Sequence, residues 1–66
     1  MNTEKLANLI KSSGITITSL AKKLQITRGS LYNKLNGETE FTVTEIIRLG
    51  EIFRLTNEEK IDVFFK

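Results

Sequence analysis

The sequence contains no cysteine, no proline and no histidine, and these absences limit what the chain can be. Without cysteine there is no disulfide framework and no thiolate metal site, so we expect stability to come from helix packing in a reducing compartment. The longest uninterrupted apolar run is only Val63-Phe64-Phe65, which argues against a membrane span or a secretory signal. We therefore expect a soluble cytoplasmic protein without metal or other cofactor.

Length and charge point to one domain with two unlike halves. Sixty-six residues without an evident linker predict a single domain over 1–66, which buries roughly 60% of its unfolded surface. Residues 1–37 carry six Lys or Arg against one Glu, whereas the remaining residues carry four against seven acids. Such asymmetry is typical of a molecule with one side facing a polyanion, although scattered solvated lysines explain part of it.

Apolar residues recur at helical spacing along the whole chain and predict five short helices without strands. Four threonines stand just before apolar-periodic segments, where a hydroxyl can accept a hydrogen bond from a first-turn amide: Thr16, Thr27, Thr42 and Thr56. The spacing of Thr42 to Glu45, and of Thr56 to Glu59, also fits the reciprocal capping box. Gly14 and Gly37 lie where the first and third helices should end.

Residues 16–37 are the most informative segment. Two helices separated by only a few residues cannot lie antiparallel, so they must cross steeply around a shared core. The apolar positions that we expect to supply this core are Leu20, Ala21, Leu24, Ile26, Leu31 and Leu35. The second helix then turns Gly29, Asn33 and Asn36 outward, with Tyr32 and Lys34 beside them. Arg28 stands at its leading end, and arginine can bind guanine with two parallel hydrogen bonds.

The end of this segment, residues 31–37, reads Leu-Tyr-Asn-Lys-Leu-Asn-Gly, and it is followed by Phe41-Thr42 and a helix with Ile46, Leu49, Gly50 and Phe53. In these features the chain resembles the Cro and repressor-type helix-turn-helix family, the XRE-like regulators of phages and bacteria. It is most similar to small phage regulators with a Leu-x-x-Lys-Leu-Asn-Gly ending. The resemblance covers nearly the whole chain and implies an all-α, compact bundle of five short helices, lambda-repressor-like, with a central helix-turn-helix over about 16–37. It also implies double-stranded DNA as partner, bound as a homodimer on a near-palindromic operator.

Carried onto this sequence, the resemblance implies two groups of DNA-contacting residues. The expected base-reading positions are Arg28, Gly29, Tyr32 and Asn33, joined by Ser30 because Gly29 offers no side chain. The expected DNA-backbone positions are Thr16, Ile17, Thr18, Lys22, Lys23, Thr27, Lys34 and Asn36. Two departures from the family pattern stand out: Gln25 occupies a turn position that is usually Gly, predicting modest strain, and Ile17 replaces a common polar residue.

The last helix carries Ile61, Phe64 and Phe65 at helical spacing. We expect Ile61 and Phe64 to close the core, because so small a domain needs its aromatic residues inside. Phe65, next to the chain end, is the stronger candidate for a dimer contact, with Phe64 beside it. A partly exposed apolar end would mark a subunit interface.

The predicted function is a sequence-specific transcriptional regulator, a phage or prophage Cro-like repressor, and not an enzyme. Glu38 and Glu40 are close in sequence, but no His, Cys or phosphate-binding Gly loop accompanies them to support acid-base chemistry. We also interpret these two acids as a device against non-specific DNA affinity. A competing hypothesis is a modulator, antirepressor or antitoxin that binds a partner protein, and a third is a DNA-binding module of a longer repressor.

Overall fold

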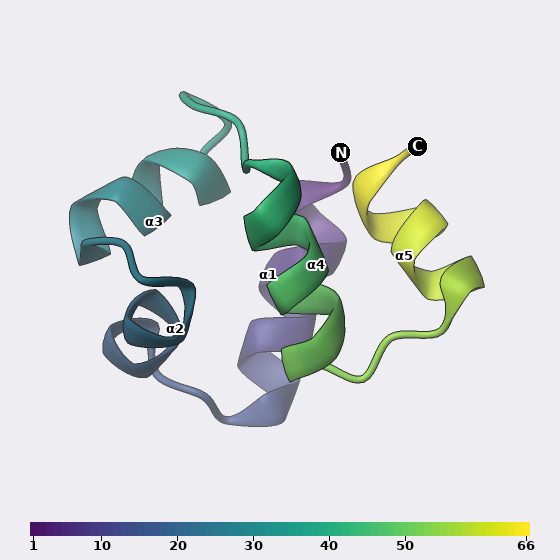
Figure 1. Cartoon of the computed structure of the whole chain (residues 1–66), viewed down its shortest axis with the longest axis horizontal. Coiled ribbons are helices and arrows are strands. Elements are labelled where there is room, and N and C mark those ends of the chain that lie inside the picture. The colour runs from purple at the N-terminus through teal and green to yellow at the C-terminus, as the bar shows by residue number, and fades with distance from the viewer.

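The computed structural model describes all 66 residues and contains five helices and no strand. The helices in chain order are α1 Thr3–Ser13, α2 Ile17–Leu24, α3 Arg28–Leu35, α4 Val43–Ile52 and α5 Asn57–Phe64 (Figure 1). They form a body of 28 × 23 × 20 Å. The predicted all-α bundle of five short helices is confirmed.

Helix starts follow the threonines. Thr16, Thr27, Thr42 and Thr56 are the N-caps of α2 to α5, and each hydroxyl oxygen accepts a hydrogen bond from the backbone N–H three residues later. At α4 and α5 this third residue is a glutamate that completes the predicted capping box. Gly14 ends α1 with a φ of 76°, a left-handed conformation that glycine adopts without strain.

The core lies where four of the helices converge. Its fully buried side chains are one leucine from each of α1 to α4: Leu6, Leu20, Leu31 and Leu49. α3 packs on α2 and α1, while α5 packs on α1. Figure 1 accordingly shows α2 and α3 on one side and α5 on the other, with α1 and α4 between them. The helix-turn-helix and the last helix therefore occupy opposite ends of the longest axis.

The last helix turns a different face inward from the one expected. Val63 and Phe64 are buried, but Ile61 is 48% exposed and Phe65 68% exposed. Gly50 of α4 explains the orientation, since a Cβ built there would lie 2.8 Å from the Lys60 side chain. The Lys60 stem thus lies against α4 at Gly50, and Ile61 is left partly exposed. The prediction of Ile61 in the core is wrong, and so is that of Phe64 as a dimer contact, because Phe64 is only 5% exposed.

None of the five helices combines the length and the apolar character needed to cross a bilayer.

Candidate nucleic-acid interface

α2 and α3 form a tight helix-turn-helix. The turn closes when the Ile26 N–H donates to the Ala21 carbonyl at 3.0 Å. Gln25 ends α2 with φ 60° and ψ 40°, a left-handed conformation that glycine adopts more readily. The predicted strain at Gln25 is thus present, at a cost of about 1 kcal/mol. Leu20, Ala21 and Leu31 are almost completely buried between the two helices, which fixes the angle at which α3 leaves the turn.

α3 presents a polar face to solvent. Arg28, Gly29, Asn33 and Asn36 are exposed, and Tyr32 is 44% exposed. Nothing lies within 4 Å of the position that a Gly29 side chain would occupy. A guanidinium, a phenol and two amides therefore stand on one open helix face, which are the groups that hydrogen-bond base edges in a major groove.

The helix starts beside this face have no acidic residue. The first turns of α2 and α3 contain no Asp or Glu, whereas those of α1, α4 and α5 each contain at least one Glu. The partial positive charge at the start of a helix is thus left uncompensated only in the helix-turn-helix. Because the Thr16 and Thr27 hydroxyls accept amide bonds, each can still donate its proton to a phosphate.

The remaining candidate DNA-backbone residues divide into two groups. Thr18, Lys22 and Lys23 are exposed along α2, as expected. Ile17 is half-buried and packs against the core, so its side chain supports the fold. Ser30, expected on the base-reading face, is half-buried at the third position of α3.

Lys34 does not lie on the outward face of α3, and that expectation is wrong. Its side chain is only 10% exposed, and its Nζ donates to Glu45 Oε1 at 2.5 Å. The same Glu45 oxygen accepts the Thr42 amide at 2.8 Å. Burial raises the pKa of Glu45, but the bonds from Lys34 and Thr42 outweigh it and hold that pKa below its ordinary value. Lys34 is therefore already paired inside the protein.

Sequence reasoning missed this pair because helix geometry placed Lys34 beside the outward positions of the helix, and it was counted with the exposed polar face. One signal was available, since Lys34 lies three residues after the buried Leu31 and hence on the flank of the inward arc. Glu45 had been recognised only for its capping box. Lys34 and Glu45 are eleven residues apart and lie on different helices, so no spacing within one helix predicts their contact.

Comparison with protein families matches residues 5–61 to the Cro/C1-type HTH DNA-binding domain. The chain belongs to this family. Cro/C1-type domains are DNA-binding regulators and not typically enzymes. The match spans all of α2 and α3, so the exposed face of α3 is the surface of a Cro/C1-type helix-turn-helix. Comparisons with curated proteins and with solved structures gave no match.

Proposed function

We propose that this Cro/C1-type domain is a sequence-specific transcriptional regulator that represses a promoter by occupying an operator, as a small phage or prophage Cro-like repressor would. The observation that supports this proposal is the open polar face of α3 next to two helix starts that contain no acidic residue. The former supplies base-edge partners and the latter supply phosphate partners. Both are needed for a protein that selects a sequence and does not merely bind DNA.

In this proposal α3 enters the major groove with its first turn leading. Arg28 donates two bonds to a guanine, and Asn33 exchanges a donor and an acceptor with an adenine. Tyr32 and Ser30 assist at neighbouring bases, and Gly29 allows a close approach. The DNA backbone is held by the side chains and amides that border α3: Thr16, Thr18, Lys22, Lys23, Thr27 and Asn36.

We further propose that two copies bind together through α5. α5 lies at the end of the molecule opposite α3 (Figure 1). Ile61 on this helix and Phe65, its C-terminal cap, are both exposed. α5 is acidic at its start, with Glu58 and Glu59, and the basic Lys66 lies two residues after its end at Phe64. Two antiparallel copies of α5 therefore bring each Lys66 toward the acids of the other.

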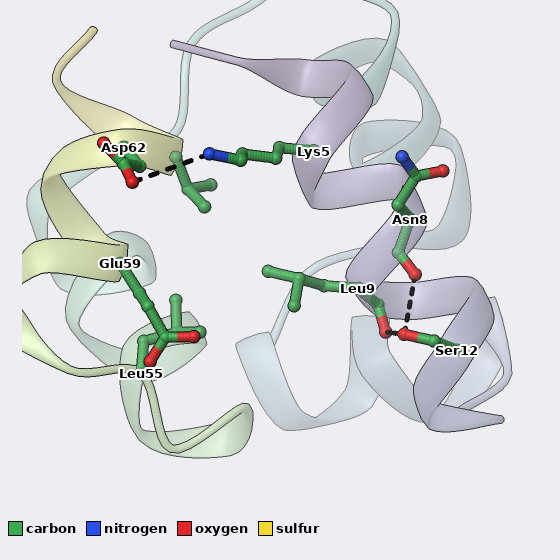
Figure 2. A pocket seen from close by; sticks show the side chains of 8 residues that line it. Lys5, Asn8, Leu9, Ser12, Leu55, Glu59 and Asp62 are labelled. Atoms are coloured by element: carbon green, nitrogen blue, oxygen red, sulfur yellow. Dashed lines mark hydrogen bonds and ion pairs between the residues drawn. The ribbon is translucent and has the colours of Figure 1, made fainter.

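A groove beside α5 would receive the aromatic side chain of the second copy. It lies between α1 and α5, has a volume of about 390 Å³, and its apolar floor is Leu9, Leu55 and Val63 (Figure 2). Lys5 and Asp62 face each other across its rim at 3.6 Å. Phe65 of the second copy would cover this floor, and burying a phenyl ring is a major contribution to an interface.

The test is selection of bound duplexes from a randomised DNA library, followed by fluorescence-anisotropy titrations of the enriched and a scrambled duplex at low and near-physiological salt. We expect an enriched near-palindromic motif and a preference for it that survives the higher salt. Asn33→Ala should lower discrimination at one or two base pairs per half-site by about 1–3 kcal/mol. Equal weakening on every sequence would contradict base readout by Asn33.

The dimer has its own measurement, sedimentation of the protein with the enriched duplex. Phe65→Ser should leave one copy on a half-site with a large loss of affinity for the whole motif, while Val43→Ser, which changes an exposed apolar residue on α4, should not. Absence of any enriched motif would favour the alternative of a protein-binding modulator, antirepressor or antitoxin, for which the exposed Ile61 and Phe65 offer a contact surface.

A further inference from the structure

α3 is held differently at its two ends. At its start, Thr27 caps the helix and the fully buried Leu31 anchors it in the core. The last turn has no comparable apolar anchor, because Leu35 is only partly buried. The side chain that enters the interior there is Lys34. A charged group thus replaces an apolar anchor at the end of the helix.

Lys34 reaches α4 through a short chain of contacts. Its ammonium bonds Glu45 Oε1 and lies 5.7 Å from the centroid of the buried Phe41 ring, within the range of a cation–π interaction. Glu45 in turn accepts the Thr42 amide and donates its own N–H to the Thr42 hydroxyl. The end of α3 is therefore tied to the cap of α4 through one carboxylate.

The loop between the two helices returns to the same end of α3. The Glu38 and Thr39 N–H groups approach the Asn33 carbonyl at 2.9 and 3.4 Å, and Gly37 N–H donates to the Lys34 carbonyl at 3.2 Å. The carbonyl of Asn33 is thus bonded by the loop that leads to Thr42, whose amide the Lys34-bonded carboxylate of Glu45 accepts. Arg28, at the opposite end of α3, takes no part in these contacts.

We propose that Lys34 and Glu45 are positioning residues for base readout, which set where the last turn of α3 lies in the major groove. They determine discrimination at the base pairs that Tyr32 and Asn33 contact and leave those that Arg28 contacts unchanged. This inference rests on the proposed function. The physical reason for the positioning role is the length of the helix. Eight residues span about 12 Å, so a small tilt of α3 about Leu31 moves its last turn out of hydrogen-bonding distance from the bases.

A buried ion pair suits this task better than an apolar contact. Its desolvation cost offsets much of its attraction, so it adds little to stability compared with apolar residues of the same size. Its hydrogen bond is directional, however, and permits one relative placement of α3 and α4. Apolar side chains at these positions would allow α3 to slide along α4.

The experiment compares the wild-type chain with Lys34→Met/Glu45→Gln, which keeps side-chain volume and leaves no unpaired buried charge. Lys11→Met, which removes an exposed cation on α1 outside the proposed DNA-contacting residues, is the matched control. The probes are the duplex that the wild type enriches and its single-base-pair variants. Arg28→Ala and Asn33→Ala show which base pairs depend on each of these two residues. We expect the double variant to melt cooperatively and its preference at Asn33-dependent pairs to fall from about tenfold to about twofold. Arg28-dependent preferences and the salt dependence should stay at the wild-type level.

Three results would overturn the inference, and they are distinguishable. A decrease of about 0.9 in the magnitude of the negative slope of log affinity against log salt would make Lys34 a phosphate contact. Preserved discrimination at every position would make the pair merely structural. A wild-type chain without sequence preference would refute the proposed function itself. In that case, hydrogen exchange of the free protein still tests positioning, since the double variant should accelerate exchange at Glu38 and Thr39 but not at Leu31.

Discussion

The four threonine-capped helices fall into two pairs that use the same cap differently. In α4 and α5 the residue three positions after the threonine is Glu45 or Glu59, which returns a bond to the cap. In α2 and α3 the corresponding residue is Ser19 or Ser30, which cannot compensate the positive helix start. The difference shows where the chain forgoes local stability. It does so only at the two helix starts that we propose to bind DNA phosphates.

The largest effect is expected when the start of α3 is given the acid that α4 and α5 carry. Ser30→Glu should complete a capping box at α3 and raise the free energy of unfolding by about 0.5 kcal/mol. The same charge should lower DNA affinity at least about tenfold, because it faces phosphate and cancels the helix dipole. Thermal melts and anisotropy titrations measure the two effects.

Ser30→Gln is the matched control, because glutamine can also close a capping box without charge. It should gain stability and lose far less affinity than Ser30→Glu. If both variants bound DNA equally well, the acid-free start of α3 would have no role in phosphate binding.

Removing one threonine cap from each pair of helices should lower the free energy of unfolding by the same modest amount in both variants. Thr27→Ala and Thr56→Ala each remove one hydroxyl acceptor and should each cost about 1 kcal/mol of unfolding free energy. On a duplex with a single half-site, only Thr27→Ala should also weaken DNA binding, since α5 lies away from α3 (Figure 1). A parallel loss of affinity in Thr56→Ala would mean that affinity follows global stability alone.

The strained turn within the helix-turn-helix should yield a smaller gain. Gln25→Gly relieves the left-handed conformation but increases the entropy of the unfolded chain, so we expect a net stabilisation of about 0.5 kcal/mol. DNA affinity should not change, because the backbone already has the required shape. Chemical denaturation measures the gain; destabilisation would show that the Gln25 side chain makes a contribution of its own.

The smallest effect is expected when the pH is lowered and the exposed capping box of α5 is protonated. Bonds from the backbone and hydroxyl of Thr56 lower the pKa of Glu59 in the folded protein. Its ionised form therefore favours folding above the pKa of the unfolded chain, and this contribution is lost as pH falls through the folded pKa. Glu59→Gln should flatten the decline of melting temperature between neutral pH and about pH 3. An unchanged slope would mean that Glu59 does not contribute.

The helix starts could be predicted from the sequence because capping is a local interaction. A threonine hydroxyl reaches an amide three residues away whatever the rest of the chain does. Thr42 with Glu45 therefore identified the start of α4 before any packing was known. The inward positions of α2 and α3 were equally accessible, since Leu20 and Leu31 follow helical spacing within one compact motif.

Errors arose where a distant neighbour decided the outcome. Ile61 fits the periodicity of a buried position, yet Gly50 leaves space that the Lys60 stem fills, and α5 turns accordingly. Lys34 carries a charge that favours solvent, yet Glu45 and Phe41 from another segment receive it. Local periodicity cannot report such contacts, because it contains no information on which surface each helix meets.

Sequence patterns were thus sufficient to predict the five helices, the threonine caps of the last four, the helix-turn-helix and the polar face of α3. All of these depend on bonds and spacings within about one or two helical turns. Tertiary structure alone decided that Lys34 is buried, that α5 exposes Ile61 and Phe65, and that α5 lies at the end opposite α3. Those outcomes depend on how separate helices fit together, since burial of a charged or apolar group is set by the neighbours that surround it and not by its own chemistry.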